Sequence, residues 1–589
     1  MARLNGCFPK LLPTLTGWRR LAILNIGAMT LLTLLLCGFT VASILKTDLT
    51  QIGRYHINGE YNFERGAAVR NGFLFHSSPC REPTAGNINT VLHLLVNAVS
   101  SAILASSSFF SQVLSSPTRA EVDVSHARGR SVDVGVLSWR NALRLSPFKT
   151  VAWVALLVTS LPLHLLFNSA ILQSVDSEVS LQGDDAACYV GVSNPLLLTV
   201  TLACLVKVII CVTVVWVLGR QEPLVTPGDA VASFISMPDP STAGRLDMLI
   251  PAWKHGASIG SPILWRHTPR RRASCLSSRT WAYTYILFIA CIAAAAGILG
   301  KEYHMIQKDG WLPASFRDSS SAYTIMPPKS SVPFITTMLL ANIPQLVLSV
   351  WYLAYNAILT RLQLSQEWAL LSASCRPLRV SQPKGRQVGT YRLQLPYRYS
   401  ILLISLSAVM HFLLSKSSFV LLYTDDDHSP GFDSFEDLQT LPRDLLVAWG
   451  LSPTYLAALL ALAVTAIQIP WLLGLLRLPG YMPPVGSDSQ AIAAACHVSP
   501  LAKAPLSEQM EGKGEGYEPV SMADEEGNSG LLAVSRSLLS WGVVKMPQDW
   551  YDAQVDRRDS SGTGRPVEHL SFGTALDGVK RPIRGRFYS

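Results

Sequence analysis

The sequence predicts an all-α, polytopic membrane protein with about eight transmembrane helices and a disordered C-terminal tail. Hydrophobic residues make up 49% of the chain and charged residues only 15%, a balance typical of membrane proteins. Apolar runs also recur near the length of about 20 residues that a helix needs to cross a hydrocarbon core of about 30 Å. Finally, Lys and Arg alternate between successive loops, as they do on the two sides of a bilayer.

The eight candidate spans are residues 21–45, 89–113, 150–173, 196–218, 281–301, 334–360, 399–423 and 450–476. The first is too long for a signal-peptide core of about 7 to 15 residues, so we expect a retained anchor. Three of the spans contain an internal proline, Pro162, Pro344 or Pro470, and proline kinks a helix. Three regions follow: a basic tail at 1–20, a helical domain at 21–476 and a tail at 477–589.

The loops between these spans differ in positive charge. If the N-terminus is cytosolic, the inner loops 114–149, 219–280 and 361–398 carry 21 Lys and Arg, whereas the four outer loops carry nine. Positive charge in short loops marks the cytosolic side. We therefore expect both termini in the cytosol, in a plasma membrane or an endomembrane. The cluster Arg270-Arg271-Arg272 then suits lipid headgroups better than nucleic acid, and no nucleic-acid partner is predicted.

Two cysteines fall in the predicted outer loops. They are Cys80 and Cys188 among the ten cysteines of the chain, and an oxidising compartment allows a disulfide to persist. The pair is a candidate disulfide, with two free thiols as the alternative.

Short motifs also predict local structure on the inner side. Thr118 and Glu121 have the spacing of a capping box at a helix start, and residues 226–234 have the pattern of a short amphipathic helix. Beyond residue 476 the composition turns to Pro, Gly, Ser and charge, which favours disorder. Two apolar islands, 493–497 and 538–544, are expected to dock on the membrane domain or on a partner.

Histidine and asparagine recur within two of the spans. His93 and Asn97 lie one helical turn apart, as do His164 and Asn168. If the two helices are antiparallel, the rise per residue levels His93 with Asn168 and Asn97 with His164. Such pairs can simply hold helices together. With Asn342 and His411 from two later spans, they can alternatively line a polar cavity in which histidine senses pH or relays protons.

Lys207 lies near the middle of the fourth span, and no span contains an Asp or Glu to pair with it. An unpaired cation at this depth indicates a functional site, where it meets an anionic solute or a lipid headgroup. The alternative is that its long side chain reaches the interface.

The familiar catalytic motifs are absent from the sequence. It has no phosphate-binding loop, no His-Glu-x-x-His zinc helix, no Gly-x-Ser-x-Gly elbow and no Cys-x-x-Cys pair. A metal site built from His93, His164 and His411 has no carboxylate to complete it. The sequence therefore predicts no catalytic residue, no metal and no cofactor.

Several phrases in one order resemble a family of fungal multi-pass membrane proteins whose N-terminal region is a domain of unknown function. The resemblance implies an integral membrane protein and transfers no activity, ligand or catalytic residue. The sequence departs from the family pattern after the last of these phrases, because Lys545 and Met546 follow Val544 where the family has a cysteine-containing phrase. The phrases that carry the resemblance are Gly17-Trp18-Arg19, Leu92-His93-Leu94-Leu95-Val96-Asn97, Pro117-Thr118-Arg119, Pro162-Leu163-His164-Leu165-Leu166-Phe167-Asn168, Gly228-Asp229-Ala230, Pro238-Asp239-Pro240, Glu367-Trp368, Leu395-Pro396-Tyr397-Arg398, Met410-His411 and Trp541-Gly542-Val543-Val544.

Two functions fit these observations. The first is a transporter or channel for an anionic or polar solute, with Lys207 as the charge partner and the histidines and asparagines as the polar lining. The second is a non-catalytic sensor or scaffold that binds cytosolic proteins through its inner loops and tail. The lipid bilayer is a partner in both.

Overall fold

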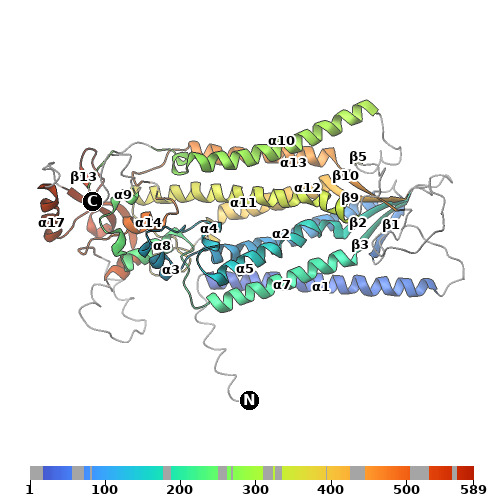
Figure 1. Ribbon diagram of the computed structural model, residues 1–589, viewed down its shortest axis with the longest axis horizontal. Helices are drawn as coiled ribbons and strands as arrows, with labels where there is room; N and C mark the ends of the chain where they lie inside the picture. The colour runs from blue at the N-terminus through green and yellow to red at the C-terminus, as the bar shows by residue number, and fades with distance from the viewer. Residues whose placement is uncertain are drawn as a thin grey trace, which may run out of the picture.

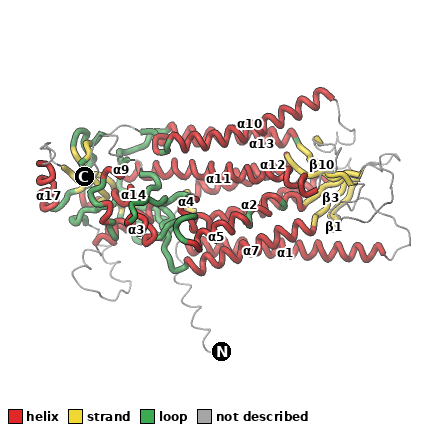
Figure 2. The backbone as a smooth tube through the Cα atoms, in the orientation of Figure 1, coloured by secondary structure: helices red, strands yellow, loops and turns green. Residues whose placement is uncertain are grey.

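The computed structural model is a long helical bundle with a β-sheet at one end, the sheet end, and a folded domain at the other, the domain end (Figure 1). Figure 2 shows the strands gathered at these two ends. The structure describes residues 18–55, 72–79, 83–176, 187–249, 262–266, 270–309, 323–324, 334–389, 391–392, 394–424, 445–483, 485–503, 530–559 and 567–589.

Eight helices within these residues are long and apolar enough to cross a membrane, and they indicate a membrane protein. Their outward faces are apolar: Leu34, Ile209 and Leu402 are 60%, 64% and 69% exposed. Exposed apolar surface on this scale suits contact with lipid. The spans are built from α1 (Trp18–Tyr55), α2 (Thr84–Ser115), α5 (Pro147–Val158) with α6 (Leu161–Leu165), α7 (Asn194–Leu218), α10 (Ser278–Asp309), α11 (Phe334–Ala373), α12 (Tyr397–Ser417) and α13 (Pro453–Leu475).

The prediction of an all-α fold was wrong, because two spans end in strands. The expected helix at 150–173 breaks between α5 and α6, turns through η1 (Asn168–Ala170) and continues as β2 (Ile171–Asp176). The expected helix at 399–423 ends at Ser417 and continues as β9 (Ser418–Thr424). A short apolar run does not distinguish a buried strand from more helix. Both predicted helices were therefore extended into residues that form strands.

The sheet end is a six-stranded sheet. Counted inward from either edge, each strand has its counterpart in the other half of the chain. The order is β1-β3-β2-β9-β10-β5, where β1 (Gly72–Pro79) precedes α2 and β5 (Tyr323–Thr324) precedes α11. The hairpin of β2 and β3 (Ala187–Ser193) connects the third span to the fourth, as β9 and β10 (Leu445–Leu451) connect the seventh to the eighth. The central strands β2 and β9 are parallel, as a twofold axis along the bundle requires.

The hairpin registers of the two halves also agree. Ile171 pairs with Val192 in the first hairpin, and Ser418 pairs with Leu451 in the second. Each pairing joins the first residue of one strand to a residue at the end of the other. The chain then leaves β3 through Gly-Val-Ser and β10 through Gly-Leu-Ser, and proline follows at the start of the next helix. The first four spans and the last four are therefore structural repeats.

Each repeat has its own apolar core. The first half, α1, α2, α5, α6 and α7, packs around residues such as Phe110 and Val200, and the second half, α10 to α13, around Trp351 and Tyr355. The halves meet where α2 packs on α12 and α6 packs on α11. We call this contact the seam.

The domain end corrects the prediction of a largely disordered tail. Where the structure describes it, the tail forms α14 (Ser489–Ala495), β11 (Leu538–Val544), α17 (Gln548–Asp559) and β12 (Val567–Thr574). The apolar islands of the tail are buried here in one core, which includes Ile492 and Trp541. They fold because distant segments pair with them: the second sheet has the order β4-β13-β12-β11-β6, with β4 (Ile263–Leu264), β6 (Arg376–Pro377) and β13 (Phe587–Tyr588).

The predicted inner loops contribute the rest of this domain. The expected capping box of Thr118 and Glu121 is present at the start of α3 (Arg119–Ala127), and α8 (Pro227–Ser236) confirms the predicted amphipathic helix. The long helix α11 runs from the seam into the domain core, where Trp368 is 2% exposed. One helix thus joins the bundle to the domain (Figure 1).

Candidate functional site

All but one of the predicted intramembrane polar residues lie at or beside the seam. His93 and Asn97 are on α2, His164 on α6, Asn168 just after it, Asn342 on α11 and His411 on α12. All but Asn168 are less than 9% exposed. The first half supplies the first four residues and the second half the last two. These polar contacts between the halves lie beside a small apolar cluster in which Leu172 of the first half packs with Met338 and Val420 of the second.

Asn97 connects the two halves near the sheet end. Its Nδ2 lies 3.0 Å from Asn168 Oδ1 and 2.9 Å from Ser415 Oγ of α12. Asn97 therefore contacts Asn168, not the expected His164, whereas the expected contact between His93 and Asn168 is present as a side-chain hydrogen bond. The Nδ1 of His93 is buried without a hydrogen-bond partner within the described structure.

His164 and His411 stack on each other at the seam. Their ring centroids are 5.6 Å apart, with an angle of 26° between the ring planes. Ser349 Oγ of α11 lies 3.1 Å from His164 Nε2, and Gln345 Oε1 lies 2.6 Å from His411 Nδ1. The two histidines are equivalent in the repeats, since each lies seven residues before the strand that begins at Ile171 or at Ser418. The pair therefore sits on the approximate twofold axis.

Asn342 forms a further contact across the seam. Its Nδ2 donates to Ser169 Oγ at 2.6 Å and to the carbonyl of Met338 at 2.8 Å. The structure thus brings six of the seven predicted residues into one polar belt, which extends from the stacked histidines to the sheet end.

Lys207 is the exception, because it is buried inside the first half. Its Nζ donates to the carbonyl of Leu156 at 2.9 Å, to Ser160 Oγ at 2.8 Å and to Ser107 Oγ at 3.2 Å. These bonds occupy the three donors of an ammonium group. The Leu156 carbonyl is available because the amide of Ser160 bonds to Leu157 at the helix break. Lys207 therefore binds a break in the third span, at the negative end of α5.

The candidate disulfide is not tested, because Cys80 lies outside the described residues. Cys188 is on β3, where its backbone pairs with Ser78 of β1. The pair of Cys80 and Cys188 stays a prediction.

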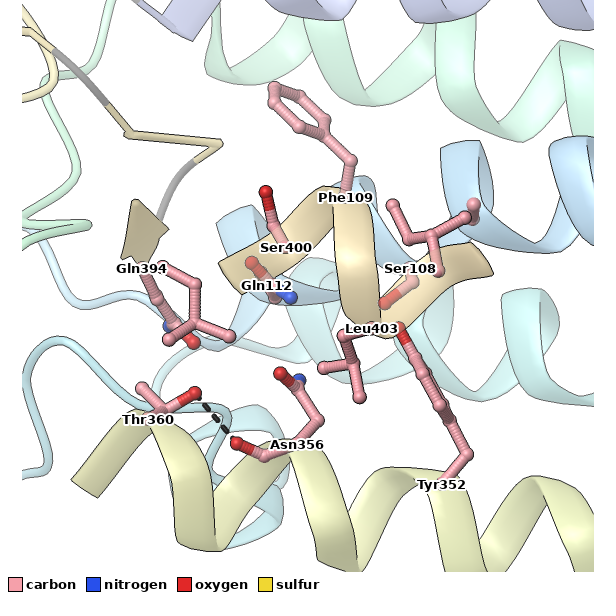
Figure 3. Close-up of a pocket in the computed structure, with 12 residues that line it drawn as sticks. Ser108, Phe109, Gln112, Tyr352, Asn356, Thr360, Gln394, Ser400 and Leu403 are labelled. Atoms are coloured by element: carbon pink, nitrogen blue, oxygen red, sulfur yellow. Dashed lines mark hydrogen bonds between the residues drawn. The ribbon is translucent and has the colours of Figure 1, made fainter. Parts of the chain in front are cut away.

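A pocket of about 40 Å³ opens at the domain end of the seam. It lies between α2, α11 and the start of α12 (Figure 3). Its polar lining comes from Ser108, Gln112, Tyr352, Asn356, Thr360, Gln394 and Ser400. These residues do not stand out as a site in the sequence, because isolated amides and hydroxyls near helix ends form no motif.

The domain contains three residues with the contacts of a serine-hydrolase triad. His126 Nε2 lies 2.8 Å from Ser489 Oγ, and His126 Nδ1 contacts Asp239 Oδ2. However, Ser489 has no exposed surface, and its Oγ already accepts the amide proton of Val132 at 3.0 Å. A catalytic serine must reach its substrate. The trio is therefore a buried clamp between α3, α14 and η3 (Pro240–Thr242).

Fold and site together describe two helical repeats that meet at a polar seam, with eight helices among the described residues long and apolar enough to cross a membrane. Residues 18–174 match the model of a family of unknown function (DUF6536), and residues 257–511 match that of a domain of unknown function (DUF8419). The first match covers α1 to α6 and the second covers the four spans of the second half. No curated protein and no solved structure matches the chain. The two matches confirm that the chain contains domains of unknown function, as the resemblance implied.

Proposed function

We propose that this protein is a membrane transporter that moves a small polar solute along the seam. The observation that carries the proposal is that two structural repeats meet through buried histidine and amide side chains, with a pocket at one end of the same contact. Secondary transporters commonly bind their substrates between structural repeats, and parallel repeats related by an axis along the membrane normal are one known arrangement.

The contacts of Lys207 favour an uncharged solute over an anionic one. All three of its donors bind groups of the first half, so a solute anion would have to displace them. The residues that line the pocket carry amides and hydroxyls and include no Asp, Glu, Lys or Arg. We therefore assign the polar-solute form of the hypothesis to the seam.

We further propose that the domain end faces the cytosol of a fungal cell and that the protein lies in the plasma membrane or an endomembrane. The three basic loops all contribute to the domain end, and positive charge favours the cytosolic side. Arg19, at the start of α1, also lies there, because its side chain donates to the carbonyl of Gly219 at 2.7 Å. Anionic lipid headgroups are then natural neighbours of these arginines.

The test is the water accessibility of the seam. Single cysteines at Ser349 and Ser415, in a variant whose native cysteines are replaced, are exposed to a membrane-impermeant maleimide from either side of a proteoliposome. Transport requires the seam to open, so both positions should react, and the accessible side should change with conditions. Ser107→Cys is the matched control: it replaces a serine that is 4% exposed on α2 but faces Lys207 and should stay unreactive.

The second candidate is a membrane scaffold or sensor that binds cytosolic proteins. The extension of α11 into a large folded domain favours it, since that helix links any partner of the domain to the seam. A scaffold needs no water in the seam. If Ser349→Cys and Ser415→Cys stay as unreactive as Ser107→Cys from both sides, transport along the seam is wrong and the scaffold becomes the better proposal.

A further inference from the structure

The pocket at the domain end of the seam has the chemistry of a binding site for an uncharged solute. In Figure 3 the amides of Gln112, Asn356 and Gln394 point toward the same space, with Ser400 above them. They come from α2, α11 and the turn before α12, so both halves contribute to the pocket. A solute bound there contacts both repeats at once.

Gln394 has an unused donor in this pocket. The residue is only 6% exposed, and its Nε2 has no hydrogen-bond partner within the described structure. A buried donor without a partner destabilises the folded protein. Gln394 lines the pocket, so an acceptor bound there can reach this amide. The site is therefore incomplete without a hydrogen-bonding ligand or water.

The lining also restricts the class of ligand. A side-chain amide offers both a donor and an acceptor, as a hydroxyl group does, so three amides around one space match a molecule with several hydroxyls. Leu395 and Leu403, each 4% exposed, supply an apolar wall for its carbon atoms. A full charge has no counter-ion among the lining residues, and burying one without a partner is costly.

The size of the pocket sets the length of that molecule. A cavity needs roughly 10 to 15 Å³ for one water molecule, so about 40 Å³ has room for about three. A three-carbon polyol has one hydroxyl for each of these positions, and a four-carbon polyol has one more. We propose that the pocket binds a small uncharged polyol of the size of glycerol or erythritol, and that it is the domain-side substrate site of the proposed transporter. The role in transport rests on the proposed function, whereas the binding itself does not.

The experiment measures occupancy of the pocket separately from transport. Ser108→Cys, and in a second variant Ser400→Cys, places a thiol in the pocket of the full chain, and its labelling by a small maleimide is timed with and without erythritol. At ten times the dissociation constant about nine sites in ten are filled, so labelling should slow about tenfold. Sodium lactate, of similar size but charged, should not slow it.

Two variants remove the groups that would bind the polyol. Gln394→Leu and Asn356→Leu should each abolish the protection by erythritol while the thiol still reacts. Gln221→Leu, which removes an exposed amide on an inner loop, should leave the protection intact. The labelling rate without solute shows whether each variant keeps the folded pocket. If one of the two leucine variants does not fold, the other still tests the proposal.

The outcomes separate this proposal from transport itself. If erythritol does not slow labelling in either cysteine variant, or if urea or lactate slows it equally, the polyol site is wrong. If protection survives both leucine variants, the assigned amides are wrong. Protection without movement of erythritol into proteoliposomes, followed by light scattering, supports the site but removes the transport path. If the cysteines in the seam are labelled but erythritol does not protect the pocket, the proposed transport is supported and the polyol site is wrong.

Discussion

The two halves of the bundle solve one structural problem in different ways. Each contains an interrupted helix in which one carbonyl has lost its backbone amide partner. In the first half the break between α5 and α6 frees the carbonyl of Leu156, and the ammonium of Lys207 binds it at 2.9 Å. In the second half Pro470 cannot donate to the carbonyl of Ala466, and the hydroxyl of Tyr355 binds that carbonyl at 2.9 Å.

This difference shows which parts of the repeats are free to vary. The strand order, the strand registers and the positions of the two histidines agree between the halves, whereas the group that binds the free carbonyl does not. A charged group in one half and a neutral one in the other satisfy the same need, because a helix break inside a membrane must have its backbone groups satisfied by neighbours. The shared features lie at the seam, and the variable ones lie inside each half.

The largest expected effect comes from removing the charged group. Lys207→Met keeps the side-chain length but leaves the hydroxyl oxygens of Ser160 and Ser107 without their donor, and it removes one of the donors to the carbonyl of Leu156. Each buried group that loses its partner costs about 1 to 3 kcal/mol, so we expect the free energy of unfolding to fall by about 3 kcal/mol or more. Tyr355→Phe, the matched change in the second half, should cost only about 1 kcal/mol.

Both variants can be compared by unfolding in detergent micelles. A Lys207→Met protein that is as stable as the wild type but has lost solute movement contradicts the structural role. That result would make Lys207 a binding group and would favour an anionic solute again. Equal losses in the two variants would show instead that charge adds nothing to this contact.

The halves also differ at the domain end, and acid should expose that difference. α2 stops at Ser115, whereas α11 continues into the domain. Burial, with the nearby His569, lowers the pKa of His497 in that domain to about 4, and burial also lowers the pKa of His569. Groups whose folded pKa is lowered stabilise the fold above their unfolded pKa of about 6.5 and lose that contribution as the pH falls toward 4.

One carboxyl group in the domain opposes this trend. Burial raises the pKa of Asp229 to about 6, so its protonation favours the folded state as the pH falls from about 6 toward its unfolded value. The shifts of His497 and Asp229 are similar in size and nearly offset each other, so the lowered pKa of His569 predicts a net loss of stability as the pH falls from 6.5 to 4. His569→Gln should flatten this dependence, and Asp229→Asn should steepen it.

Hydrogen exchange can show where the loss is felt. Amides near Trp368, at the domain end of α11, should lose protection in acid before amides near Val113 at the end of α2. If both helix ends lost protection together, or if neither did, the expected difference between α11 and α2 would be wrong.

Much of the membrane part could be predicted from the sequence, because length and apolar content alone identify a spanning helix. The strands after α6 and α12 could not, since the apolar stretch of β9 looks like a continuation of the helix before it. The hydrogen-bond acceptors of Lys207 could not be predicted from the sequence either. One of them is a backbone carbonyl, which a search for carboxylates does not find. The folded tail was missed because β11 is buried only when β12 and the short strand β6 pair with it.

The candidate site was predicted in part for a similar reason. Histidine and asparagine in apolar segments are conspicuous, and six such residues do lie at or beside the seam. Gln394 and Gln112 are not conspicuous, because amides near the ends of helices are common on solvated surfaces. Only the packing of α2, α11 and α12 shows that they share a pocket.

A smaller effect is expected at the stacked histidines, and it tests whether the two residues are equivalent. His164→Leu and His411→Leu each remove one ring of the stack and a contact with Ser349, so each should cost about 1 to 2 kcal/mol. His411 also contacts Gln345 and should cost the more of the two. Because they share partners, the double variant should cost less than the sum. Additive losses in unfolding measurements would mean that the stacked pair is not a unit.

The smallest effect comes from exchanging a pair of equivalent residues across the axis. Asn168 and Ser415 each lie three residues before a strand and both lie within reach of the Asn97 amide. Asn168→Ser and Ser415→Asn should each cost about 1 kcal/mol, because each changes the set of groups around Asn97. Together they restore one amide and one hydroxyl at positions related by the twofold axis. The double variant should therefore unfold within about 0.5 kcal/mol of the wild type; if it is less stable than both single variants, the equivalence of the halves does not extend to their side chains.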